Sequence, residues 1–213
     1  MPAHVSGVDA NQDEPANPFG MDEDCTNCDL CERRERVVHG YGDVGADFLF
    51  VGEGPDGAAE AAGVPFGRDD AFGRVLQRLG LRRVDDDPDE PELGNVFLTT
   101  LTRCHHPDRA ATDDEIGTCE PYLNAEIRMI NPEIIVPVGE RALAEIGTEY
   151  TTTPAADLDL YAQHGEAIRG RGFELVPMIP PREATDEQVQ TFVERFAALM
   201  ASDYRQTKGR RER

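Results

Sequence analysis

Five cysteines are the residues of this chain whose type and spacing most clearly indicate chemistry. Cys25 and Cys28 form a Cys-x2-Cys pair, and Cys104 and Cys119 lie far downstream. Thiolates bind iron in clusters and zinc in tetrahedral sites, and a Cys-x2-Cys spacing lets one turn present two sulfurs to one metal centre. We interpret these four residues as ligands of an iron–sulfur cluster, with zinc ligation and plain buried thiols as the alternatives. Cys31 lacks the closing Cys-Pro of a ferredoxin run and is predicted to be a spare thiol.

A second candidate site is the glycine-rich turn Gly52-Glu53-Gly54-Pro55, which follows a short apolar run. Glycines after a strand let backbone amides approach a phosphate or a sugar. The Gly-Lys-Ser/Thr of a nucleotide-binding loop is missing here. Further on, Phe66 stands between a proline and a glycine, where an exposed ring can stack on a nucleobase. The alternative for Phe66 is an ordinary core position.

The charge of the chain bears on its partners. There are 42 acidic and 21 basic residues, a net charge of −21, and the acidic residues are spread over the whole sequence. We interpret this as the acidic surface of a halophile's protein, since at about 1 M salt the Debye length is only about 3 Å and self-repulsion is screened. Binding DNA then needs only a local basic patch, for which Arg68, Arg109 and Arg182 are the candidates. The alternative is that these arginines pair with surface carboxylates.

Length and apolar content indicate one domain with tails. The chain has 213 residues, and its apolar runs are short. No run reaches the 18 residues of a membrane helix, and the polar N-terminus does not read as a signal peptide. We therefore expect a cytoplasmic monomer without a membrane partner. In that reducing compartment, cysteines favour metal ligation over disulfides.

Four expected strands alternate with helices along the chain. The strands are at 47–51, 96–101, 134–138 and 173–179, and the helices are at 32–36, 71–79, 113–130, 140–146 and 186–200. Thr112 and Glu115 form a capping box for the helix at 113–130, and Thr185 caps the last helix. The stretch 52–63 is expected to be a loop.

This alternation predicts a three-layer α/β/α domain whose central sheet is mainly parallel and four-stranded. Ligands in such sheets bind at the carboxyl ends of the strands, which are followed here by Gly52–Pro55, Thr99–Cys104, Gly139 and Pro180–Arg182. The expected organisation is a disordered acidic leader at 1–22, the domain at 23–202 and a basic tail at 203–213.

Taken together, the order and spacing of these pieces from Cys25 to Gly147 resemble the iron–sulfur, family-four uracil-DNA glycosylases. The matching pieces are Cys25-x2-Cys28, Arg34, Val37-Val38-x-Gly40-x-Gly42, Phe50-Val51-Gly52-Glu53-Gly54-Pro55, Gly63-x-Pro65-Phe66, Cys104, Pro107, Cys119, Asn131-Pro132 and Gly139-x-x-Ala142. The resemblance implies a glycosylase-type α/β/α fold and a 4Fe-4S cluster on the two cysteine pairs. It further implies that a flipped uracil stacks on Phe66, while backbone groups of Glu53 and Gly54 help to position the base and an attacking water.

Among the departures from the pattern of that family, three fall on positions that carry its chemistry. Its acidic residue six places after Glu53 falls on Ala59, with Glu60 next to it as a substitute. The asparagine that reads the uracil edge falls on Thr100. The His-Pro-Ser motif near the C-terminus falls on Pro180-Pro181-Arg182.

The expected function is therefore a DNA-repair hydrolase that cleaves the N-glycosidic bond of uracil or another damaged base in DNA. One alternative is a catalytically idle paralogue that binds nucleic acid or protein. Another is a small electron-transfer protein, which the absence of flavin and ferredoxin-like motifs disfavours.

Overall fold

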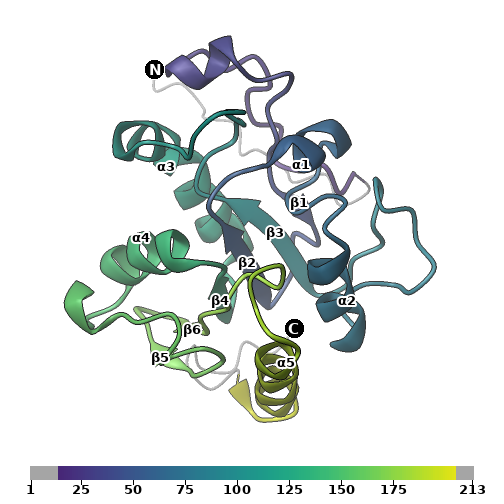
Figure 1. Cartoon of the computed structure of the whole chain (residues 1–213), viewed down its shortest axis with the longest axis vertical. Coiled ribbons are helices and arrows are strands. Elements are labelled where there is room, and N and C mark those ends of the chain that lie inside the picture. Colours follow the sequence, from purple (N-terminus) through teal and green to yellow (C-terminus); the bar gives the residue numbers. More distant parts are fainter. Residues whose placement is uncertain (1–13, 205–213) are drawn as a thin grey trace, which may run out of the picture.

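A single six-stranded sheet forms the centre of the computed structural model, which describes residues 14–204 (Figure 1). Its strand order is β1-β3-β2-β4-β6-β5. The strands are β1 (Tyr41–Gly42), β2 (Phe48–Gly52), β3 (Val96–Thr100), β4 (Ile134–Pro137), β5 (Ile168–Arg169) and β6 (Glu174–Leu175). The four inner strands are parallel, whereas β1 and β5 pair antiparallel at the two edges. The predicted parallel four-stranded centre is confirmed, and the two edge strands are additions to it.

Helices cover both faces of the sheet, as Figure 1 shows. They are α1 (Gly57–Ala62), α2 (Asp70–Arg78), α3 (Asp113–Ile130), α4 (Glu140–Tyr150) and α5 (Asp186–Met200), with short 3-10 turns η1 (Asp29–Glu32) and η2 (Ala155–Asp157). Successive side chains of a strand point to opposite faces. Accordingly, Phe48 and Phe50 of β2 pack with α2 and α5, while Leu49 and Val51 pack with α3 and α4. Two apolar cores, one on each face, hold the three layers together.

Helix starts follow the capping residues of the sequence. The predicted capping box of Thr112 and Glu115 is present, and α3 spans the predicted 113–130. Thr185 caps α5 as expected. The expected loop at 52–63 is wrong in its second half, because Asp56 caps α1 there and Gly63 ends that helix with φ 75°. The helix expected at 32–36 is also wrong, since the turn lies earlier, at Asp29–Glu32.

Part of the expected leader packs against the domain. Phe19 is buried against Phe97, with ring centroids 5.8 Å apart, and Ala16 forms a bridge with Tyr41. At the other end, the Tyr204 hydroxyl donates to the Asp47 carboxylate at 3.0 Å. The expected disordered leader and basic tail otherwise fall on residues 1–13 and 205–213, outside the described residues. Across residues 14–204, no helix is both long enough and apolar enough to cross a membrane.

Candidate active site

A cavity of about 730 Å³ lies at the carboxyl ends of β2 and β4, where ligands of parallel sheets bind. Among its lining residues are Gly52, Glu53 and Gly54 of the glycine turn, Phe66, and Arg182 from the loop after β6. These predicted site residues come from three separate stretches of the chain, and the fold brings them together. Asp56, Asp69, Gly139, Arg141 and Pro180 complete much of the wall.

Phe66 lies on the wall of this cavity in a constrained position. Its ring stacks on that of Phe72, with centroids 4.1 Å apart and planes 14° apart. Its backbone has φ 58°, a left-handed conformation that is rare for a bulky residue and often marks a functional site. A Cβ built on Gly52 would meet the Phe66 ring at 2.7 Å, so the ring reaches the end of β2 only because residue 52 is glycine. The ring is half-buried, and so combines a core contact with a face on the cavity.

The glycine turn is anchored by backbone bonds to the end of β3. The Leu101 amide donates to the Gly52 carbonyl at 2.8 Å, and the Thr102 amide donates to the Glu53 carbonyl at 3.1 Å. A Cβ on Gly54 would meet Thr102 Oγ1 at 2.6 Å. The half-buried Glu53 carboxylate makes no side-chain hydrogen bond or ion pair with any other residue in 14–204. It is therefore available to a ligand in the cavity.

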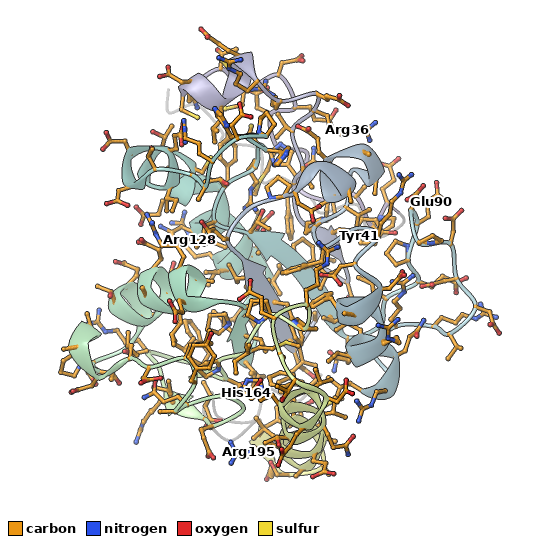
Figure 2. The ribbon with its side chains drawn as sticks, viewed as in Figure 1. Arg36, Tyr41, Glu90, Arg128, His164 and Arg195 are labelled. Atoms are coloured by element: carbon orange, nitrogen blue, oxygen red, sulfur yellow. The ribbon has the colours of Figure 1, made fainter. Side chains whose placement is uncertain are left out.

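Three predicted site residues, Pro55, Glu60 and Thr100, do not line this cavity. The Glu60 carboxylate is buried and accepts from the backbone amides of Glu35 at 2.9 Å and Arg36 at 3.5 Å. It therefore fastens α1 to the preceding segment, where Arg36 is labelled beside that helix in Figure 2. Thr100 is also buried, and its hydroxyl donates to the Thr102 carbonyl at 2.7 Å. Neither side chain lines the cavity that holds Glu53 and Phe66.

The three arginines of the expected basic patch are all paired with carboxylates. Arg68 binds Asp89 at 2.7 Å, and Arg109 binds Glu115 at 2.7 Å. Arg182 binds both Asp56 at 2.8 Å and Asp69 at 2.9 Å. The structure therefore agrees with the alternative to a free basic patch, in which these arginines pair with carboxylates. Of the three, only Arg182 lines the large cavity.

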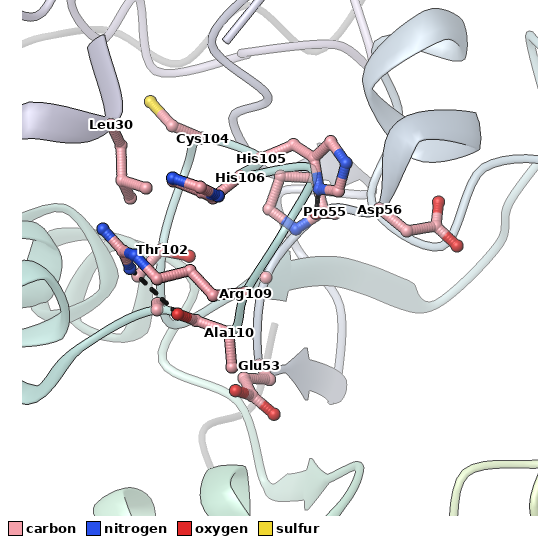
Figure 3. A pocket seen from close by; sticks show the side chains of 12 residues that line it. Leu30, Glu53, Pro55, Asp56, Thr102, Cys104, His105, His106, Arg109 and Ala110 are labelled. Carbon is pink, nitrogen blue, oxygen red and sulfur yellow. Dashed lines mark hydrogen bonds between the residues drawn. The ribbon is translucent and has the colours of Figure 1, made fainter. Parts of the chain in front are cut away.

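A second cavity of about 260 Å³ joins the glycine turn to the cysteine region. Figure 3 shows Cys104 and His106 in the upper left of this cavity, His105 beside Pro55 with Asp56 to their right, and Glu53 at the bottom. His105 Nδ1 lies 3.1 Å from the Pro55 carbonyl, so the loop after β3 contacts the turn directly. Pro55 thus lines this second cavity and not the large one.

The four predicted cluster ligands lie in one region. Cys104 and Cys119 are buried, and Cys25 and Cys28 are half-buried. The pKa of Cys104 is raised to about 12, mainly by burial, with a contribution from the nearby thiols of Cys119, Cys28 and Cys25. Within the described chain, however, no three histidine, cysteine or acidic residues are close enough to hold a metal ion. The thiols thus share a region without forming an assembled ligand set.

The surroundings of these thiols fit an anionic group. Nη1 of Arg34 is buried and has no hydrogen-bond partner among residues 14–204, and the charge of Arg34 lowers the pKa of Cys104. A buried donor without a partner costs roughly 1–3 kcal/mol. An iron–sulfur cluster ligated by thiolates would supply negative charge at this place. The donor set of four thiols and one unpartnered guanidinium nitrogen is therefore compatible with such a cluster.

A buried ion pair behind Cys104 was not predicted from the sequence. Arg103 Nη2 donates to Glu126 Oε2 at 2.7 Å, and both side chains are almost completely buried. Glu126 also accepts from the Gly40 amide at 3.1 Å and from the Thr99 hydroxyl at 2.5 Å. Burial raises the pKa of Glu126, and Arg103 and the two hydrogen bonds oppose that shift. The network joins α3, β3 and the segment before β1 next to a predicted cluster ligand.

The fold and the cavity define an α/β protein with a ligand-sized cavity at the carboxyl ends of its parallel strands. The family model of the uracil DNA glycosylase superfamily matches residues 39–200. The chain belongs to that superfamily.

Curated relatives agree with this assignment. The chain is 35% identical over 124 residues to the type-4 uracil-DNA glycosylase of Saccharolobus solfataricus, covering 55% of this chain and 52% of the relative. It is 35% identical over 123 residues to that of Thermotoga maritima, covering 56% and 59%. The type-5 uracil-DNA glycosylase of Pyrobaculum aerophilum is 24% identical over 172 residues, covering 78% and 74%. The chain thus spans about half to three fifths of the length of these type-4 relatives.

Proposed function

We propose that this protein hydrolyses the N-glycosidic bond of a uracil flipped out of DNA. The observation that carries the proposal is the cavity at the strand ends, where the unpaired Glu53 carboxylate and the Phe66 ring share one wall. The superfamily and the type-4 relatives supply the class of reaction. The base must leave the stack because its glycosidic bond is inaccessible inside a duplex.

Each residue at the cavity has a role that its position suits. Phe66 would stack on the flipped base, as aromatic rings do in nucleic-acid sites. The Glu53 carboxylate would face the sugar, orient the attacking water and stabilise the positive charge that develops there. The backbone of Gly52 and Gly54 would let the base approach closely, since neither residue carries a side chain.

A 4Fe-4S cluster held by Cys25, Cys28, Cys104 and Cys119 is the second part of the proposal. When bound, the cluster would supply a covalent link between the N-terminal segment and the loop after β3. What supports it is the shared region of the four thiols and the buried, unpartnered Arg34 nitrogen. Because the Cys104 loop contacts Pro55, this link would also support the glycine turn.

A catalytically idle, nucleic-acid-binding paralogue is the second candidate. Ala59 stands where an acidic residue was expected, and Thr100 uses its hydroxyl on a backbone carbonyl. These positions favour the idle candidate, whereas the free carboxylate of Glu53 favours the enzyme.

The deciding experiment is a single-turnover excision assay. Oligonucleotides that contain uracil are incubated at low and multimolar salt, and abasic sites are cleaved with alkali. The net charge of −21 predicts that activity requires the higher salt. Excision that is lost in Glu53→Gln supports the enzyme. Uracil-dependent binding with no excision at any salt selects the idle paralogue.

The cluster is tested separately by absorption and iron content after anaerobic purification. We expect broad absorption near about 400 nm, which Cys104→Ser removes. Cys31→Ser is the matched control, because Cys31 is a half-buried thiol in the same region but outside the proposed ligand set. Colourless protein that contains zinc would contradict the iron–sulfur assignment.

A further inference from the structure

Arg182 is held by the capping residues of two helices on the cavity wall. Asp56 Oδ1 caps α1 by accepting from the Ala59 amide at 2.8 Å, and Asp56 Oδ2 accepts from Arg182 Nη1 at 2.8 Å. Asp69 repeats this arrangement on α2. Its Oδ1 accepts from the Phe72 amide at 3.0 Å, and its Oδ2 lies 2.9 Å from Arg182 Nε. The N-cap carboxylates of α1 and α2 therefore hold the guanidinium of Arg182 in one orientation.

The remaining nitrogen of this guanidinium is available to a ligand. Arg182 Nη2 has no hydrogen-bond partner in residues 14–204, while Nε and Nη1 are held as described. About half of the side chain is exposed. Arg182, Asp56 and Asp69 all line the cavity that contains Glu53 and Phe66. The free N–H groups thus belong to a side chain that lines this cavity and whose other two nitrogens are held by carboxylates.

The other arginine of the cavity wall is arranged differently. Arg141 donates to Asp113 of α3, and its Nε donates to Glu145 at 3.0 Å. Neither of these carboxylates lines the large cavity. Arg141 therefore links α3 to its own helix, α4. Arg182 differs from Arg141 in that both of its carboxylate partners, Asp56 and Asp69, line the cavity.

We propose that Arg182 is a catalytic residue that stabilises the uracil anion as it leaves. This inference rests on the proposed function. In the reaction, the bond between C1′ and N1 breaks and its electron pair stays on the base. The water oxygen bonds to C1′, and the proton that water loses neutralises the departing uracil. Nη2 of Arg182 donates to a carbonyl oxygen of the base while that charge develops.

A hydrogen-bond donor that is fixed before the reaction needs no reorganisation when charge develops on the base. A guanidinium also stays protonated at all relevant pH values and presents its N–H groups in a rigid fork. The loop that carries Arg182 is itself anchored. His164, labelled beside α5 in Figure 2, accepts at Nδ1 from the Ile179 amide at 3.0 Å, and its Nε2 lies 2.9 Å from the Gln188 carbonyl.

The test compares two leaving groups in single-turnover assays of Arg182→Gln. Uracil leaves as the less stable anion, and 5-fluorouracil leaves as the more stable one. Removing one well-placed donor should slow uracil excision by about 10²–10³-fold. We expect a clearly smaller loss with 5-fluorouracil, because its anion needs less stabilisation. Arg83→Gln is the control, since Arg83 forms a surface ion pair with Glu92 at 2.8 Å and does not line the cavity.

Equal losses on both bases would overturn the inference, because they would make Arg182 a structural clamp only. Unchanged excision of both bases would overturn it as well. Should Arg182→Gln not fold, Arg182→Lys serves the same comparison, since it keeps the charge and loses the fork. If the wild-type protein excises neither base, the proposed function itself has failed, which distinguishes the two outcomes.

Discussion

Two arginines held by carboxylates lie on opposite sides of the glycine turn, and their surroundings are opposite. Arg103 and Glu126 are 2% and 1% exposed, next to the cysteine region. Arg182 and Asp56 are each 48% exposed, at the mouth of the base cavity. A buried pair that loses one partner leaves an uncompensated charge in the protein, whereas an exposed pair loses little because water replaces the partner.

Because one ion pair is buried and the other is exposed, the two pairs are suited to different roles. The buried pair joins α3 to β3 and fixes the strand end that precedes Cys104. Because it is buried, this pair can stabilise the fold but cannot contact a substrate. The exposed pair contributes little to stability, and its free nitrogen can meet one.

The largest expected effect follows from breaking the buried pair. Glu126→Ala should destabilise the protein by about 3–5 kcal/mol, because Arg103 then remains buried without its carboxylate. Urea unfolding at fixed salt measures this change. Glu92→Ala breaks the exposed pair with Arg83 and should cost less than about 1 kcal/mol. Equal losses in the two variants would refute the contrast between buried and exposed pairs.

The second effect concerns the position of Phe66. Gly52→Ala places a Cβ 2.7 Å from the Phe66 ring, which must move away from the end of β2. The loss of base stacking should weaken uracil-dependent binding by about 1–3 kcal/mol. Fluorescence anisotropy with uracil- and thymine-containing oligonucleotides measures it. Gly94→Ala is the control, since a Cβ there meets nothing within 4 Å. Full uracil preference in Gly52→Ala would show that the ring position is unimportant.

An element of this fold could be predicted from the sequence where the residues that determine its limits lie next to it in the chain. The limits of α3 were predicted because its start signal, Thr112 with Glu115, and its stop signal, Asn131-Pro132, are local. The edge strands β1 and β5 were missed because two residues cannot show a period of two. Helix α1 was missed because its alanines carry no apolar periodicity.

The residues of the candidate site also differ in whether the sequence could place them. Glu53 and Arg182 could be placed at one cavity because the carboxyl ends of parallel strands meet at one edge of the sheet, whereas Phe66 was placed there by the family resemblance. The direction of a single side chain depends instead on distant partners. Glu60 turns to amides 24 and 25 residues away, and Arg103 to a carboxylate 23 residues away. Such pairings leave no pattern in the sequence.

The third effect depends on pH and concerns the start of α3. The Arg109 guanidinium and the capping box hold the pKa of Glu115 at about 2, below its ordinary value of 4.5. A depressed pKa contributes stability above pH 4.5, and that contribution is lost as pH falls toward 2. Glu115→Gln should therefore cost about 0.5–2 kcal/mol at neutral pH and lose less on acidification.

Unfolding by urea across pH 2–5 checks this dependence for Glu115→Gln. The control is Glu120→Gln, which removes an exposed carboxylate from the same helix. It should keep the acid dependence of the wild-type protein. The prediction fails if Glu115→Gln and the wild-type protein lose stability in parallel over this pH range.

The smallest effect on stability is expected at the exposed pair itself. Arg182→Gln should change the free energy of unfolding by about 1 kcal/mol or less, because water can solvate Asp56 and Asp69 once the guanidinium is gone. Both carboxylates keep their bonds to helix amides, so α1 and α2 remain capped. A variant that unfolds like the wild-type protein yet excises uracil far more slowly would assign Arg182 to the reaction. A loss near that of Glu126→Ala would instead mean that the cavity mouth is part of the framework, and the separation between the two arginine pairs would not hold.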